Sequence, residues 1–121
     1  MPRSHQDSGD LPPGKSYTRL TAAIDVEVTL GLLEGRWKLL ILFQLFGGQV
    51  RRFSELERLV TGISQKMLAQ QLRRLEAEGL VLRTVHAEVP PRVEYRLSEW
   101  GERLCPALDG LLTWLHQRPV A

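Results

Sequence analysis

The pattern of apolar and polar positions is most informative from Gly62 to Gly101. Ser64 is a residue type that caps helix N-termini, and about four turns of amphipathic helix follow it before Glu78–Gly79. Two short apolar stretches, Leu80–His86 and Val93–Leu97, then predict strands joined by a proline-containing tip. Because apolar and polar residues alternate in the second stretch, we expect one buried face and one face in water.

Three more helices are predicted before this segment. Apolar residues at spacings of three and four predict a first helix over Ala23–Leu33. The stretch Arg36–Phe46 is apolar on all sides, which is typical of a helix in the middle of a core, and Gly47–Gly48 would end it. Ser54 is predicted to cap a third helix, with Glu57 completing a capping box.

A last helix is predicted from Ser98 to about Leu115, with a kink or break near Glu102 because Pro106 lacks a backbone donor. The predicted order is therefore four helices, two strands and a helix, in a mainly α protein with a small β-hairpin. The short turn at Thr61–Gly62 between the third and fourth helices is the helix-turn-helix signature. With the hairpin added, the pattern predicts a winged helix-turn-helix.

Length and composition fit one small domain. The chain has 121 residues, of which 43% are hydrophobic and 25% are charged. Residues 1–17 are polar, contain Pro, Gly and Ser, and show no periodicity, so we expect a flexible N-terminal arm. The folded domain, for DNA binding and dimerisation, is predicted over residues 18–118.

Several classes of protein are disfavoured by what the sequence lacks. A single cysteine excludes an internal disulfide and a multi-thiolate metal site within one chain. No apolar run reaches the length of a membrane span, and the N-terminus has no signal-peptide core, which together predict a cytoplasmic protein. We find no nucleophile motif, phosphate-cradling glycine loop or pair of metal ligands, so we expect neither an enzyme nor a cofactor.

The distribution of charge favours nucleic acid as a partner. The net charge is only +2, but residues 51–96 carry nine Lys/Arg against six Asp/Glu. The basic excess therefore lies in the predicted helix-turn-helix and hairpin, where contact with DNA would need it.

The helix that follows Ser64 has one apolar stripe and an opposite face suited to the major groove. Lysine can donate to guanine, glutamine can bond to adenine, and a small alanine can meet a thymine methyl. Free amides in the first turn favour a phosphate. The residues predicted to contact DNA here are Ser64, Gln65, Lys66, Ala69, Gln70 and Arg73. The alternative is an ordinary solvated helix face.

Two other places offer cations to the DNA backbone. Arg92 lies at the predicted hairpin tip, with Arg83 and His86 on the strand before it. Arg51 and Arg52 lie just before the third helix. Each of these residues could instead be a solvated surface side chain.

The first and last helices carry more leucine than one small core needs. Paired across a two-fold axis, they would form a dimer and place two recognition helices roughly 34 Å apart. The alternative is that these residues complete the core of one chain, and for some of them both can hold. The predicted dimer residues are Val26, Leu30, Leu33, Leu108, Leu111, Leu112, Trp114 and Leu115.

Six blocks of residues, in this order and spacing, resemble the HxlR-type, MarR-like winged helix transcription regulators. The resemblance covers about Val26 to Trp114 and implies a homodimeric bacterial regulator that binds an operator and responds to a chemical signal. The blocks are Gly35–Leu42, Arg52–Leu56, Gly62–Leu68, Leu72–Glu76, Glu78–Val81 and Val89–Tyr95.

The chain departs from that family at the sensing position. Family members often have a cysteine, then a proline, thirteen residues before the tryptophan matching Trp37, but this chain has Ile24 and Asp25 there. Thiol sensing through that position is therefore unsupported. This chain therefore senses something else, senses through Cys105, or does not sense directly. Buried cysteines are mostly structural, which disfavours Cys105 as a redox sensor.

The sequence thus predicts a transcriptional regulator that binds double-stranded DNA as a homodimer. A winged helix used for protein–protein contact is the alternative. A small-molecule effector, bound in an apolar pocket between the core and the dimer helices, is compatible with DNA binding.

Overall fold

The computed structural model describes residues 16–120, which belong to two compact units. The first unit ends at Glu34 and the second begins at Gly35. Residues 1–15 of the predicted N-terminal arm lie outside the described residues. Across the described range, no helix has the length and apolarity needed to cross a membrane.

The first unit contains one described helix, α1 (Arg19–Leu33). It begins four residues earlier than predicted because Thr18 and Thr21 form a reciprocal capping box. The Thr21 amide donates to Thr18 Oγ1 over 3.1 Å, and the Thr18 amide donates to Thr21 Oγ1 over 2.9 Å. Most apolar side chains of α1 are exposed, including Val26 and Leu30.

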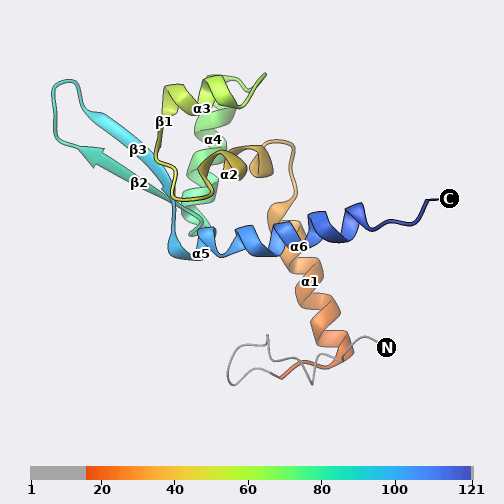
Figure 1. Cartoon of the computed structure of the whole chain (residues 1–121). Helices are drawn as coiled ribbons and strands as arrows, with labels where there is room; N and C mark the ends of the chain where they lie inside the picture. Colours follow the sequence, from red (N-terminus) through yellow and green to blue (C-terminus); the bar gives the residue numbers. More distant parts are fainter. Residues whose placement is uncertain (1–15, 121) are drawn as a thin grey trace. The chain divides into compact units, whose positions relative to one another are not determined.

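The second unit is a winged helix-turn-helix, as predicted (Figure 1). Its hairpin extends beyond the helices, and a short strand joins the hairpin edge. Its elements are α2 (Lys38–Leu45), β1 (Arg51–Arg52), α3 (Phe53–Leu59), α4 (Gln65–Ala77), β2 (Val81–His86), β3 (Arg92–Leu97), α5 (Glu99–Glu102) and α6 (Leu104–His116).

The core of this unit lies between α2, α3, α4 and the base of the hairpin. Its largest fully buried side chains are Ile41, Leu42, Leu45, Leu56, Leu68, Leu72, Leu75 and Val81. The expectation that α2 is surrounded by core on all sides is wrong. Leu40 and Phe43 remain 50% and 47% exposed, because the core reaches only one side of this short helix.

The sheet is antiparallel with strand order β1–β3–β2. The hairpin register runs from Val81 opposite Leu97 to His86 opposite Arg92. Strand β1 was not predicted, because two residues are too few to show a period. It places Arg51 beside Tyr95 and Arg52 beside Glu94 of β3.

The new strand also changes the start of α3. Arg52, not Ser54, is the N-cap residue, and the Glu55 carboxylate accepts a hydrogen bond from the Arg52 amide over 2.8 Å. The predicted Ser54–Glu57 capping box is therefore wrong. Since β1 leads directly into the helix, the cap moves two residues towards the N-terminus and Ser54 lies in the first turn.

Two polar contacts hold distant helix ends together. Lys38 is only 4% exposed, and its Nζ lies 2.9 Å from both carboxylate oxygens of Glu78, the residue that ends α4. The Glu102 carboxylate accepts hydrogen bonds from the amides of Gly47 and Gly48 over 3.1 and 2.9 Å. Glu102 also marks the predicted helix break, since α5 ends there and α6 begins at Leu104.

Candidate nucleic-acid interface

The turn before α4 fixes where this helix starts. The Met67 amide donates to Ser64 Oγ over 3.1 Å, so the predicted N-cap is confirmed. Ile63 is buried directly before it. Gly62 has a φ of 89°, and a Cβ at this position would lie 3.8 Å from the Trp37 ring. The turn thus packs against α2, and the left-handed conformation at Gly62 favours glycine.

The two sides of α4 separate as predicted. Leu68, Leu72 and Leu75 are at most 2% exposed. On the other side Ser64, Gln65, Lys66, Gln70 and Arg73 are exposed, and Ala69 is half-buried. Within the described chain, the four long polar side chains of this group make no hydrogen bond or ion pair. We call α4 the reader helix, after the base contacts predicted for its exposed donors and acceptors.

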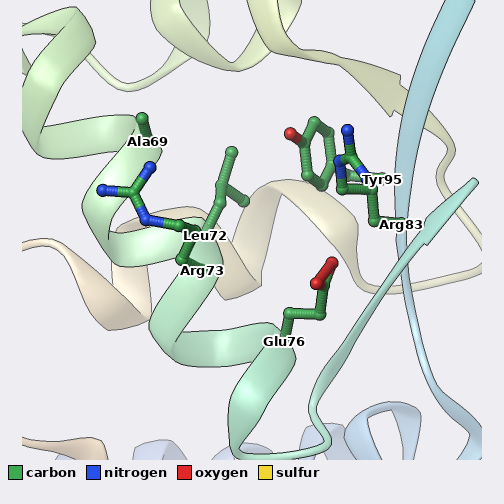
Figure 2. A pocket seen from close by; sticks show the side chains of 6 residues that line it. All are labelled: Ala69, Leu72, Arg73, Glu76, Arg83 and Tyr95. Atoms are coloured by element: carbon green, nitrogen blue, oxygen red, sulfur yellow. The ribbon is translucent and has the colours of Figure 1, made fainter. Parts of the chain in front are cut away.

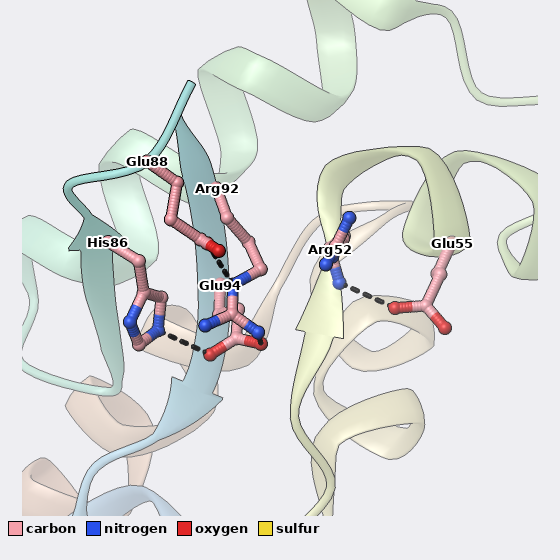
Figure 3. A network of polar contacts seen from close by, with 6 residues as sticks. All are labelled: Arg52, Glu55, His86, Glu88, Arg92 and Glu94. Atoms are coloured by element: carbon pink, nitrogen blue, oxygen red, sulfur yellow. Dashed lines mark hydrogen bonds and ion pairs between the residues drawn. The ribbon is translucent and has the colours of Figure 1, made fainter. Parts of the chain in front are cut away.

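The hairpin has two faces, and the one turned away from α4 is called the outer face. It carries a network of ion pairs near the tip (Figure 3). His86 Nε2 lies 2.7 Å from a Glu94 carboxylate oxygen. Arg92 contacts Glu88 over 2.9 Å and Glu94 over 3.7 Å. The predicted backbone ligand Arg92 is therefore held by two carboxylates.

Glu94 is the centre of this network. The hydrogen bond from His86 is the main reason that its pKa lies below the ordinary value of 4.5. The charges of Arg92, His86 and Arg52 act in the same direction, while partial burial opposes them. Glu94 is accordingly a carboxylate across the neutral pH range, and it neutralises cations that could otherwise face DNA.

The inner face of the hairpin is turned towards α4 and borders a pocket of about 320 Å³ (Figure 2). Arg83 and Tyr95 are opposite each other in the strand register and lie side by side in the pocket. The carboxylate of Glu76 points into the gap between helix and hairpin. The pocket is lined by Ala69, Leu72, Arg73, Glu76, Arg83 and Tyr95.

The inner-face pocket was not predicted as a unit. Arg83 was predicted only as a cation on the strand before Arg92, and Tyr95 and Glu76 were not predicted as site residues. The alternation of β3 already placed Tyr95 on the face that packs towards the helices. Which residues of α4 lie near Tyr95 depends on how the hairpin packs against that helix, and no local sequence pattern encodes this packing.

The two arginines before α3 have different surroundings. Arg51 Nε donates to the carbonyl oxygen of Gln44 in α2 over 3.1 Å, and its side chain is half-buried. Arg52 is exposed. Of the two predicted phosphate ligands, Arg52 is thus the more exposed.

The predicted dimer residues of α6 lie in two environments. Leu108 is 6% exposed and belongs to the core of its own unit. Leu111, Leu112, Trp114 and Leu115 are exposed, with Trp114 at 72%. In α1, Leu33 is half-buried. The exposed part of α6 is available for a partner surface.

Cys105 is half-buried in the first turn of α6. Its Sγ lies 4.0 Å from an Asp109 carboxylate oxygen. Burial, followed by the negative charges of Asp109 and Glu102, raises the pKa of the thiol above its ordinary 9.0. Cys105 therefore stays protonated at neutral pH, where a thiol is a poor nucleophile. Residues 16–120 hold no cluster of three or more side chains suited to a metal ion.

Comparison with known proteins agrees with this geometry. The sequence pattern of the HxlR-like helix-turn-helix family matches residues 32–119. The chain belongs to this family. It is 53% identical over 91 residues to YtcD, an HTH-type transcriptional regulator of Bacillus subtilis, covering 75% of this chain and 71% of that protein.

Solved structures show the same relationship. A MarR-family transcriptional regulator from Enterococcus faecalis superposes with a TM-score of 0.75 at 36% identity, covering 87% of this chain and 92% of the other. The redox regulator HypR in its reduced form gives a TM-score of 0.68 at 42% identity, covering 74% and 88%. This HxlR-like chain is thus a transcriptional regulator of the helix-turn-helix type.

Proposed function

We propose that this regulator binds an operator in double-stranded DNA as a homodimer, with α4 in the major groove and the hairpin against the backbone. The proposal rests on the difference between the two sides of α4. Its leucine stripe is buried in the core, while Lys66, Gln70 and Arg73 are exposed and unpaired within the described chain. A fixed helix with free polar groups on its outer side can read base edges.

Individual roles follow from the chemistry of each side chain. Gln70 would bond to adenine and Lys66 to guanine, with Ala69 allowing close approach. Ser64, Gln65 and the amides of the first turn would meet a phosphate. Arg52 is free to contact the backbone. Arg92 can do so only if a phosphate displaces Glu88 or Glu94.

The homodimer is supported by exposed apolar surface in both units. Helices of about 15 residues are marginal in water by themselves, and α1, with its many exposed apolar side chains, needs a partner. In α6, Leu111, Leu112, Trp114 and Leu115 offer a similar surface. Analytical ultracentrifugation should give a dimer at micromolar concentration, and a monomer would contradict the proposal.

The decisive experiment is footprinting on the region upstream of the protein's own gene, followed by base substitution in the protected site. Gln70→Ala should change preference at one or two base pairs, by roughly 1–3 kcal/mol each. Gln71→Ala is the matched control, since Gln71 is half-buried and bonds to Met67. Absence of any salt-dependent DNA binding would favour the alternative of a winged helix used for protein contact.

The signal that this regulator senses is a separate question. The raised pKa of Cys105 favours a structural thiol, and a small-molecule effector is then the simplest trigger. Hydrogen peroxide should leave operator affinity unchanged both in the wild type and in Cys105→Ser. A change in the wild type alone would instead identify Cys105 as a sensor.

A further inference from the structure

We infer that the inner-face pocket is a binding site for one phosphate group of the DNA backbone, with Arg83 as its main ligand. This inference rests on the proposed function, because it concerns how the bound duplex lies across α4 and the hairpin. It assigns a role to Arg83 and Tyr95 of the hairpin and to Glu76 of α4, and Glu76 is not among the residues of that helix predicted to contact DNA.

The path of the DNA strand leads to this pocket. If α4 occupies the major groove and the hairpin contacts the neighbouring minor groove, the sugar–phosphate strand that separates the two grooves must pass between helix and hairpin. The pocket lies at that place, with four lining residues from α4 and two from the hairpin (Figure 2). A phosphate of that strand is therefore the group nearest to the opening.

The lining supplies suitable donors. Arg83 and Arg73 make no ion pair within residues 16–120, so their guanidinium groups are available. A guanidinium can bind phosphate through two parallel hydrogen bonds, and the Tyr95 hydroxyl beside Arg83 can add another. Arg73 extends along α4 towards Ala69, at the edge of the opening.

The size and polarity of the pocket also favour a small anion. At about 320 Å³ it is at the lower limit for a small-molecule site, and such sites are mainly apolar. Here two cations face one carboxylate. Glu76 points into the gap and would repel an incoming phosphate, so it limits the affinity that the two arginines could give.

The first experiment measures affinity against salt concentration for a footprinted duplex. R83Q should bind roughly tenfold more weakly, with a log–log salt slope shallower by about 0.9 per protomer. R83K should recover part of the lost affinity, because lysine keeps the positive charge but lacks the planar guanidinium that forms two parallel hydrogen bonds. E76Q should bind roughly threefold more tightly.

Arg96→Gln is the matched control. Arg96 follows Tyr95 on the same strand but lies on the outer face, and its removal costs the same charge. R96Q should keep the wild-type slope, and thermal melting should show all variants folded. If the wild type binds no duplex, the proposed function fails. If it binds and R83Q keeps both slope and affinity, only the pocket assignment fails.

A second experiment identifies the source of the phosphate. Single methylphosphonates placed along the footprint should reveal one position per half-site that weakens the wild type but not R83Q. Calorimetry of the DNA-free protein with inorganic phosphate should show no saturable site. Saturable phosphate binding that R83Q abolishes would overturn the assignment to the backbone and identify a site for a free anion.

Discussion

The two faces of the hairpin carry similar residues in opposite states. On the outer face His86 and Arg92 are held by Glu94 and Glu88 over distances of 2.7 to 3.7 Å. On the inner face Arg83 makes no ion pair within the described residues. The number of cations on a wing is thus a poor guide to its affinity for DNA, because nearby carboxylates decide which cations are free.

The largest effect on stability is expected at the base of the hairpin, where both strands pack against Gly101. A Cβ at Gly101 would collide with the carbonyl oxygen of Leu80 and lie 3.3 Å from the Leu97 Cβ. Gly101→Ala should therefore lower the free energy of unfolding by about 2 kcal/mol, as overpacking does, in urea denaturation.

The control for this change is Gly110→Ala in α6. Apart from its chain neighbours and the nearby backbone of α6, no described atom lies within 4 Å of the Cβ that this substitution adds, so it should stabilise the helix by about 0.5–1 kcal/mol. Equal changes in the free energy of unfolding for the two substitutions would show that the base of the hairpin accommodates a methyl group without strain.

Glu94→Gln should make the outer face more like the inner one, because it removes one of the two carboxylates that contact Arg92. The contact of Arg92 with Glu88 over 2.9 Å remains, so affinity for DNA should rise by only roughly threefold, with a salt slope steeper by at most about 0.9 per protomer. Binding titrations at several salt concentrations measure both. Glu99→Gln removes the same charge from an exposed pair with Arg103 and should change neither. An equal gain in the two variants would mean that only total charge matters.

The comparison between bonded and free cations extends to strand β1, at the edge of the sheet. Arg51 is bonded to the Gln44 carbonyl, and Arg52 is exposed. Arg51→Gln loses the bond to the Gln44 carbonyl and should cost about 1 kcal/mol of stability without changing the salt slope. Arg52→Gln should leave the melting temperature unchanged and make the slope shallower by about 0.9 per protomer. Identical behaviour of the two variants in both assays would contradict their different surroundings.

The smallest effect is a pH dependence of the outer face. Because the pKa of Glu94 is lower in the folded protein than its ordinary 4.5, the ionised carboxylate stabilises the fold above that value. This stabilisation is lost as pH falls through the lowered pKa. Denaturation of wild type and Glu94→Gln should therefore differ at pH 6 and converge at strongly acidic pH. A difference that persists in acid would exclude Glu94 as its source.

Local signals accounted for most elements and for the surface of the reader helix. Ser64 caps α4 as predicted because capping depends on neighbours within three residues. Contacts between segments far apart in the chain were missed. Strand β1 is defined only by its partner β3, and its presence shifted the cap of α3 to Arg52.

The same reason explains the electrostatics of the hairpin. Glu88, Arg92 and Glu94 are close in sequence, but whether they pair depends on which face each side chain occupies. The predictions for Arg92 and for the dimer residues stay predictions.

Glu102 has a mechanical consequence for the C-terminal helix. A helix break such as the one at Arg103 is often a free joint, about which the following helix can swing. Here the last residue before the break is bonded to two consecutive amides of the loop between α2 and β1. Any pivot of α6 that carried Glu102 along would therefore have to pull on Gly47 and Gly48. The break changes the direction of the chain without making α6 independent of the body that carries the reader helix.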